Sequence, residues 1–145
     1  MGVHFPSDDF EREEMLIWAM SNIPNLRSLD KAYPIEVRRD GKRAAVAVYH
    51  EWRGQTVELS FVAVTPRWAS KEVIAEILSW PFRVLKVRRI ATITPAKNVR
   101  AIKLNKGLGF KQEGLLREVF DDDDAVLMAM VKTDFENAGW SKIGG

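Results

Sequence analysis

The sequence predicts an α+β fold in which a mixed sheet carries helices on both faces. Apolar residues recur with helical spacing after Ser7 and again after Ser70. Between them lie three β-rich segments, at residues 35–39, 43–52 and 56–65. A strand, a helix and two further strands complete the order. At 145 residues the chain fits one domain, residues 1–145.

The first helix is expected to begin at Ser7, whose side chain can cap it. Acidic residues fill its first turn, where the helix dipole favours them: Asp8, Asp9 and Glu11. Its apolar residues follow at helical spacing: Leu16, Ala19, Met20 and Ile23. The three strands that follow are joined by turn signals, Asp40-Gly41 and Arg53-Gly54, which predicts an antiparallel meander. The third is apolar on both faces in its second half, as expected of a strand covered on both sides.

Ser70 is expected to cap the second helix, which Pro81 should kink or stop near Trp80. Its buried stripe consists of Val73, Ile74, Ile77 and Leu78. A short strand at residues 89–94 leads to Asn98, the expected cap of the next helix. That helix should bury one face and end at Gly107 or Gly109; the face consists of Ala101, Leu104 and Leu108. Strands at residues 110–120 and 125–131 flank an acidic turn.

Composition excludes several classes of protein. The chain has no cysteine, so disulfides, thiolate metal sites and a Cys nucleophile are excluded. Its N-terminus is acidic and unlike a secretory signal, and no apolar run approaches the roughly 20 residues of a membrane helix. We therefore expect a soluble, cytoplasmic protein with no membrane partner. The four aspartates at residues 121–124 lack the spacing and the glycine of a calcium loop, and no metal site is expected.

The charges are segregated along the chain although the net charge is only +2. Ten basic residues and one acid, Glu113, lie between Arg83 and Arg117. Such a block suits a polyanion, either the phosphates of a nucleotide or the backbone of a nucleic acid, or it is an ordinary solvated face.

One stretch of this block carries Asn98, a small residue three positions later, Leu108-Gly109-Phe110 at the helix end, and Glu113-Gly114-x-x-Arg117. This stretch resembles the GNAT family of N-acetyltransferases. With the order of elements, the resemblance covers roughly residues 30 to 132; short phage-borne members look similar, which would place the protein in a host cytoplasm. It implies a mostly antiparallel central sheet in which the strand at residues 56–65 splays from that at 89–94.

The resemblance also implies acetyl-CoA as cosubstrate. Its pantetheine arm would insert between the splayed strands and its pyrophosphate would sit at the following helix N-terminus. The residues so implied are Val62, Val64, Arg67, Trp68, Ala69, Ser70, Lys71 and Asn98. The chain departs from the family pattern because it has no glycine between Gly54 and Gly107. Trp68 would either stack on the cofactor or cover the sheet.

Acetyl transfer to an amine needs a base, donors for the thioester oxygen and a proton for the leaving thiolate. Glu58, on the central strand, is the first candidate base, and His50, on the neighbouring strand, is the second. Each is alternatively an ordinary structural side chain. Asn105 occupies the position of the family's usual acid, a tyrosine, and an amide cannot transfer a proton.

Two functions remain open from the sequence. The first is an acetyltransferase in which an amine (a protein N-terminus, a lysine or a small amine) attacks acetyl-CoA directly in a ternary complex. The resemblance of Glu113-Gly114-x-x-Arg117 to the branch that modifies protein N-termini favours the first of these acceptors. The second is an inactive module with the same fold that holds nucleic acid or a protein on its basic face. The sequence gives no oligomeric state.

Overall fold

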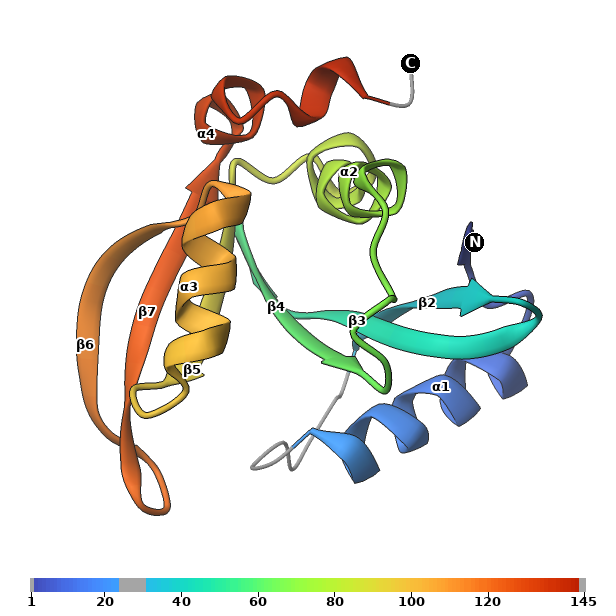
Figure 1. Ribbon diagram of the computed structural model, residues 1–145, viewed down its shortest axis with the longest axis horizontal. Coiled ribbons are helices and arrows are strands. Elements are labelled where there is room, and N and C mark those ends of the chain that lie inside the picture. Colours follow the sequence, from blue (N-terminus) through green and yellow to red (C-terminus); the bar gives the residue numbers. More distant parts are fainter. Residues whose placement is uncertain (1, 24–30, 144–145) are drawn as a thin grey trace.

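The computed structural model describes residues 2–23 and 31–143 (Figure 1). Along the chain the elements are β1 (Gly2–His4), α1 (Asp9–Asn22), β2 (Tyr33–Arg39), β3 (Lys42–Arg53), β4 (Thr56–Ala63), α2 (Lys71–Trp80), β5 (Arg89–Pro95), α3 (Val99–Leu108), β6 (Lys111–Phe120), β7 (Asp123–Val131) and α4 (Lys132–Asn137). A π-helical turn, Pro81–Leu85, follows α2, and a 3-10 turn, Trp140–Lys142, ends the described chain.

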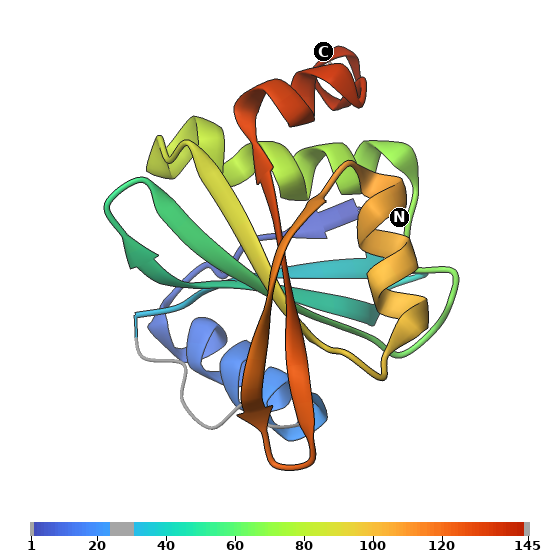
Figure 2. The same ribbon diagram turned by 90° about the vertical axis from the view of Figure 1, so that its left-hand side faces the viewer.

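Seven strands form one sheet in the order β1-β2-β3-β4-β5-β7-β6. Among the described strands, β4 and β5 form the one parallel pair, and every other neighbouring pair is antiparallel. The mixed, mostly antiparallel sheet expected from the sequence is confirmed. In Figure 2 the long β6–β7 hairpin reaches away from α4 to the opposite end of the molecule.

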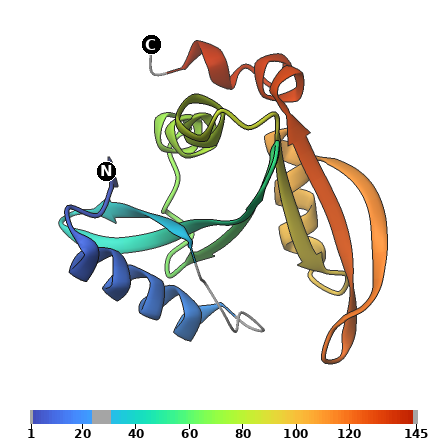
Figure 3. The same ribbon diagram turned by 180° about the vertical axis from the view of Figure 1, so that it is seen from behind.

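The helices cover both faces of this sheet, as predicted. Leu16 and Ala19 of α1 pack on Val46 and Val48 of β3. The side chains of neighbouring residues in a strand point to opposite faces. The core beneath α2 therefore gathers on the other side, around Tyr49 and with contributions from α3. Figures 1 and 3 show the same arrangement from front and back.

Helix α2 is fastened to the sheet at the point where proline interrupts it. Pro81 has no N–H, so the Ile77 carbonyl loses its usual helical donor. The hydroxyl of Tyr49, on β3, donates to that carbonyl at 2.7 Å. Tyr49 is fully buried and stacks on Trp80 at 5.6 Å between ring centroids. The predicted end of the helix near Trp80 is confirmed, and the sheet itself supplies the missing donor.

The first helix begins one residue later than predicted. Asp8, not Ser7, is its N-cap, and the Asp8 carboxylate accepts from the Glu11 N–H at 2.8 Å. Aspartate caps a helix as well as serine does. The Glu11 carboxylate in turn accepts from the Ser7 N–H at 2.9 Å, which holds Ser7 outside the helix.

The buried face predicted for α3 is partly wrong. Leu104 is 46% exposed, and Ile102 packs against the core instead, together with Leu108. Asn105 turns towards the sheet, where its side chain amide donates to the Thr92 hydroxyl at 3.5 Å. Because the polar Asn105 lies on the inner face of α3, the spacing of the apolar residues alone did not indicate the buried face. Strand β1 and helix α4 were not predicted, because three and six residues are too short to show a period.

The described residues contain no helix that is both long enough and apolar enough to cross a membrane.

Replacing Tyr49 by Phe should lower the free energy of unfolding by about 1–3 kcal/mol, because a buried carbonyl loses its donor. Urea denaturation measures this. Tyr33→Phe is the matched control, because the Tyr33 hydroxyl has no hydrogen-bond partner among the described residues. Pro81→Ala restores an N–H opposite Ile77, so Tyr49→Phe should cost less in that background. An equal cost in both backgrounds would contradict this account.

Candidate functional site

The central feature of the site is a gap between β4 and β5. Their parallel register begins at Thr56↔Arg89 and already ends at Glu58↔Ala91. Beyond these residues β4 continues beside β3, and β5 continues beside β7. Figures 1 and 3 show the two strands together near α2 and apart at their other ends. The predicted splay of the two strands is confirmed, and Glu58 stands where it begins.

In an antiparallel ladder, the backbone N–H and C=O groups of successive residues turn alternately to one neighbouring strand and to the other. This alternation shows which backbone groups face the gap. The Val64 N–H donates to the Ala44 carbonyl at 2.9 Å, so even-numbered residues here turn their backbone groups to β3. Phe61 and Ala63 therefore turn theirs to the gap. On β5 the same alternation turns the backbone of Ile93 to the gap.

Val62 and Val64, which the resemblance implied for the cofactor, lie on the part of β4 that borders the gap and just beyond its end. Their backbone groups pair with β3, and their neighbours Phe61 and Ala63 border the gap. The expectation that this half of the strand is covered on both sides is wrong, because Val64 is 58% exposed and Ala63 is exposed. Since β5 leaves β4 after Glu58, nothing in the described sheet covers that edge.

The turn between β4 and α2 lies at the open end of the gap. Ser70 caps α2 as predicted, with its hydroxyl accepting from the Val73 N–H at 3.2 Å. Residues 65–70 contain no left-handed backbone conformation, so this turn forms without glycine. Arg67 and Ala69 are exposed, and the Arg67 carbonyl accepts from the Arg39 guanidinium at 2.7 Å.

Trp68 covers the sheet beside the gap. Its ring packs on Phe61 with 4.3 Å between ring centroids, and it contacts the core beneath α2. Of the two roles open from the sequence, packing is the one this geometry supports. The two rings line the α2 side of the β4 edge.

Asn98 and Asn105 lie on the other side of the gap, on the chain that follows β5. Asn98 caps α3 as predicted, with its side-chain oxygen accepting from the Ala101 N–H at 3.2 Å. It is exposed and lies just beyond the end of β5. Asn98 and the turn at residues 66–70 thus flank the carboxyl ends of the two parallel strands. Asn105 is bound to Thr92 on the α3 side of the sheet.

The two candidate bases are direct cross-strand partners. His50 on β3 pairs with Glu58 on β4, and their side chains lie on the α1 face of the sheet. Burial raises the pKa of Glu58, and the charge of Glu51 raises it further, against the opposing effect of Arg53 and Arg89. The Glu58 carboxyl is therefore a stronger base than an exposed one.

His50 is 6% exposed and has one partnered ring nitrogen. Nε2 lies 2.7 Å from the Ser60 hydroxyl, whereas Nδ1 is buried without a hydrogen-bond partner among the described residues. The carboxylate oxygen Oε1 of Glu51 lies 4.0 Å from Nδ1. Burial lowers the pKa of His50, and the Glu51 charge opposes this effect. Sequence reasoning missed Ser60 and Glu51, whose positions matter only through the strand register.

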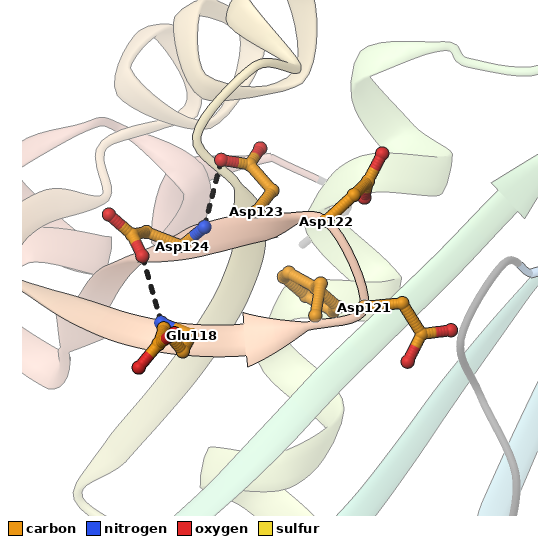
Figure 4. A pocket seen from close by; sticks show the side chains of 6 residues that line it. Glu118, Asp121, Asp122, Asp123 and Asp124 are labelled. Carbon is orange, nitrogen blue, oxygen red and sulfur yellow. Dashed lines mark hydrogen bonds between the residues drawn. The ribbon is translucent and has the colours of Figure 1, made fainter.

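Figure 4 shows the acidic turn between β6 and β7. This turn is bound to the loop that precedes α3. Asp123 accepts from the Lys97 N–H at 2.7 Å, and Asp124 accepts from the Glu118 N–H at 2.8 Å. The Lys97 ammonium donates to the Asp122 carbonyl at 2.9 Å. Within residues 2–23 and 31–143, no group of three or more His, Asp and Glu side chains is arranged to hold a metal ion. These contacts fix the hairpin beside the gap.

Solved structures share this arrangement. A variant of spermidine N-acetyltransferase SpeG from Vibrio cholerae superposes with a TM-score of 0.74 at 16% identity, covering 94% of this chain and 98% of that one. The chain has the GNAT acetyltransferase fold. Mutant forms of the spermidine/spermine N-acetyltransferase SpeG from the same organism give a TM-score of 0.66 at 18% identity over 76% and 72% of the two chains. A candidate acetyltransferase from T. thermophilus gives 0.65 at 21% identity over 75% and 63%.

At these identities the likeness establishes the fold, and the fold does not identify a substrate. No family model matches the chain, and no curated protein matches it in sequence.

The contribution of His50 to the stability of the folded protein should be lost as the pH falls below about 6.5, where an unfolded histidine begins to bind a proton. Because the pKa of His50 is lowered on folding, the unfolded state binds that proton first, and the loss continues until the pH reaches the folded pKa. Thermal unfolding between pH 7.5 and about 5 measures the slope. His50→Gln should flatten it. A slope unchanged by His50→Gln would contradict the assignment.

Proposed function

We propose that this protein transfers an acetyl group from acetyl-CoA to an amine that attacks directly in a ternary complex. The observation that carries the proposal is the early end of the β4–β5 pairing, which leaves two strand edges open to each other. The pantetheine arm is an extended chain with two amide groups, and it can pair with an open edge as an added strand does. The Phe61 and Ala63 backbone groups are the partners on β4, and Ile93 is the partner on β5.

The start of α2 fits the pyrophosphate of the same molecule. The N–H groups of Lys71 and Glu72 have no partner among the described residues, as is usual in a first helical turn. A helix N-terminus favours anions, and Arg67 and Lys71 add positive charge beside it. The turn adopts its conformation without glycine, so the departure from the family pattern does not distort it.

The chemistry falls to side chains at the closed end of the gap. The acceptor amine enters as an ammonium ion near neutral pH and must lose a proton before it attacks. Glu58 stands where the strands separate, and its raised pKa suits it to accept that proton, directly or through water. Asn98 flanks the open end and is positioned to contact the pantetheine arm, while Asn105 remains bound to Thr92.

The class of the acceptor amine is inferred by analogy with the similar structures. Several of the similar structures are spermidine N-acetyltransferases, which favours a small amine. The Glu-Gly-x-x-Arg motif suggested a protein N-terminus, but the Glu113 carboxylate accepts from the Arg89 guanidinium, and Arg117 is exposed. That ion pair braces the strands, so the motif gives no weight to a protein acceptor.

The alternative function, a binding module for nucleic acid, is favoured by one observation. Arg100, Lys103 and Lys106 are exposed on α3, and none forms an ion pair within the described residues. Binding of this kind would weaken steeply with salt.

Thermal unfolding with acetyl-CoA tests the proposal. A ligand that binds the folded state stabilises it by about 2.7 kcal/mol at a hundredfold excess over its dissociation constant. Replacing Arg67 or Lys71 by Ala should reduce the stabilisation, whereas Lys86→Ala, a basic residue after the π-helical turn, should not. No stabilisation at millimolar acetyl-CoA, together with salt-sensitive binding of RNA or DNA, would overturn the enzyme in favour of the module.

Glu58→Gln should lower kcat by about 10²- to 10⁴-fold with an amine that the wild type accepts, because a general base is lost. Its stabilisation by acetyl-CoA should be unchanged. Since the pKa of Glu58 is raised on folding, its ionised form destabilises the folded state above the unfolded pKa. The Gln variant should therefore be at least as stable as the wild type at pH 7. Glu76→Gln, on the exposed side of α2, is the control. A fully active Glu58→Gln would remove Glu58 from the mechanism.

A further inference from the structure

Acetylation of an amine moves more protons than Glu58 alone can handle. The acceptor arrives as an ammonium ion and leaves as an amide with one N–H, so it gives up two protons. One proton is released, and the other ends on the sulfur that leaves as CoA thiol. A carboxylate that still holds the first proton cannot take the second. The second proton reaches the sulfur directly from the nitrogen, through water, or through a group of the protein that first accepts it and then returns it.

Ser60 and His50 form a pair suited to this task. Ser60 lies two residues beyond Glu58 on β4, on the same face and in the part of the strand that β5 has left. It is half-buried, and its hydroxyl lies 2.7 Å from Nε2 of His50. A hydroxyl can accept one proton while it donates another, so it connects a buried base to a reacting group beside the strand.

The surroundings of His50 suit a proton acceptor better than a packing residue. Its Nδ1 is buried and has no hydrogen-bond partner in the part of the chain that the structure describes, and an unpaired buried group has a cost in folding that a purely structural residue would avoid. Glu51 Oε1 lies 4.0 Å from Nδ1, close enough to stabilise an imidazolium. Glu51 lies in a β-bulge of β3 and has a φ of 52°, a backbone conformation that is strained for a residue other than glycine. Glu51 is the charged neighbour of His50 on its own strand, and Glu58 is its cross-strand partner on β4.

The lowered pKa of His50 agrees with this role, because the ring is neutral at pH 7 and ready to accept a proton. Within the described residues, the His50 ring forms its hydrogen bond with a residue of β4 that lies beyond Glu58. Asn105, on the opposite face, has no transferable proton.

We propose that Ser60 and His50 form a proton shuttle that links the attacking amine to the leaving thiolate. As the C–N bond forms, the amine nitrogen gives its second proton to Ser60 Oγ, and Ser60 passes its own proton to His50 Nε2. As the C–S bond breaks, the imidazolium returns a proton to Ser60, and Ser60 protonates the sulfur. His50 and Ser60 end the cycle unchanged, and the acetyl group has moved from sulfur to nitrogen. The inference rests on the proposed acetyltransferase function.

Steady-state kinetics of Ser60→Ala, Ser60→Thr and His50→Gln test the shuttle, with spermidine, a lysine peptide and a peptide with a free N-terminus as acceptors. Ser60→Ala and His50→Gln should lower kcat at least tenfold with little change in KM. Ser60→Thr keeps the hydroxyl and should retain most of the activity, and Ser79→Ala, on α2, should retain all of it. Wild-type kcat in Ser60→Ala would overturn the shuttle.

Acetyl-CoA stabilisation of the same variants separates the two proposals. If the wild type is not stabilised, the acetyltransferase function fails; if every variant is stabilised and Ser60→Ala turns over normally, only the shuttle fails.

If the wild type binds acetyl-CoA but acetylates none of the three acceptors, NMR of the His50 imidazole tests the shuttle. The chain has two histidines, and His50→Gln assigns the signal. CoA should shift the His50 signal more than desulfo-CoA, which lacks the sulfur, and Ser60→Ala should abolish the difference. Equal shifts with both ligands in the wild type would overturn the shuttle.

Discussion

The separation of β4 from β5 after Glu58↔Ala91 is the constraint on which the rest of the site depends. Each strand pairs over a longer stretch with its other neighbour: β4 stays in a hairpin with β3, and β5 pairs with β7 along its whole length. The open edge therefore does not weaken the sheet. It leaves paired strands on both sides of a gap whose own backbone groups are free to bind an extended ligand.

The gap brings together groups from the two faces of the sheet. The N-terminus of α2 and the cap of α3 lie at its open end, on the side of the sheet that these helices cover. Glu58, Ser60 and His50 lie on the α1 face. A cosubstrate held from the first side and an acceptor approaching from the second would meet in the plane between the strands. The bond from Tyr49 to Ile77 fixes α2, and hence its N-terminus, against β3.

Much of this fold could be predicted because the local signals agreed. The Ser70 and Asn98 caps, the stop at Trp80 and the Asp40-Gly41 turn are each determined by neighbouring residues, and the structure has all of them. The second turn lies one residue later than predicted, at Gly54-Gln55, because Arg53 still pairs with Thr56. The resemblance to acetyltransferases located the splay. The sequence alone could not show that the backbone groups of Val62 and Val64 turn to β3, because which backbone groups face the gap depends on the pairing with β3.

Other features could not be found because they arise from tertiary contacts. Ser60 becomes relevant only when the register places it on His50, and the unpaired Nδ1 follows from burial. Leu104 was expected inside because the pattern of apolar residues cannot show that a polar Asn105 faces the sheet. The sequence departs from the family pattern because it has no glycine in the turn between β4 and α2. The backbone of this turn has no conformation that requires a glycine.

Residue-resolved amide exchange with and without CoA tests the central claim most directly. If the pantetheine arm adds to the open edge, exchange should slow at the amides of Phe61, Ala63 and Ile93. Val64 provides a control within the same strand, because its N–H is already bonded to the Ala44 carbonyl and should change little. Protection confined to Phe61, Ala63 and Ile93 is the predicted result. Binding of CoA without protection at these three amides would show that the gap is not where the cosubstrate lies.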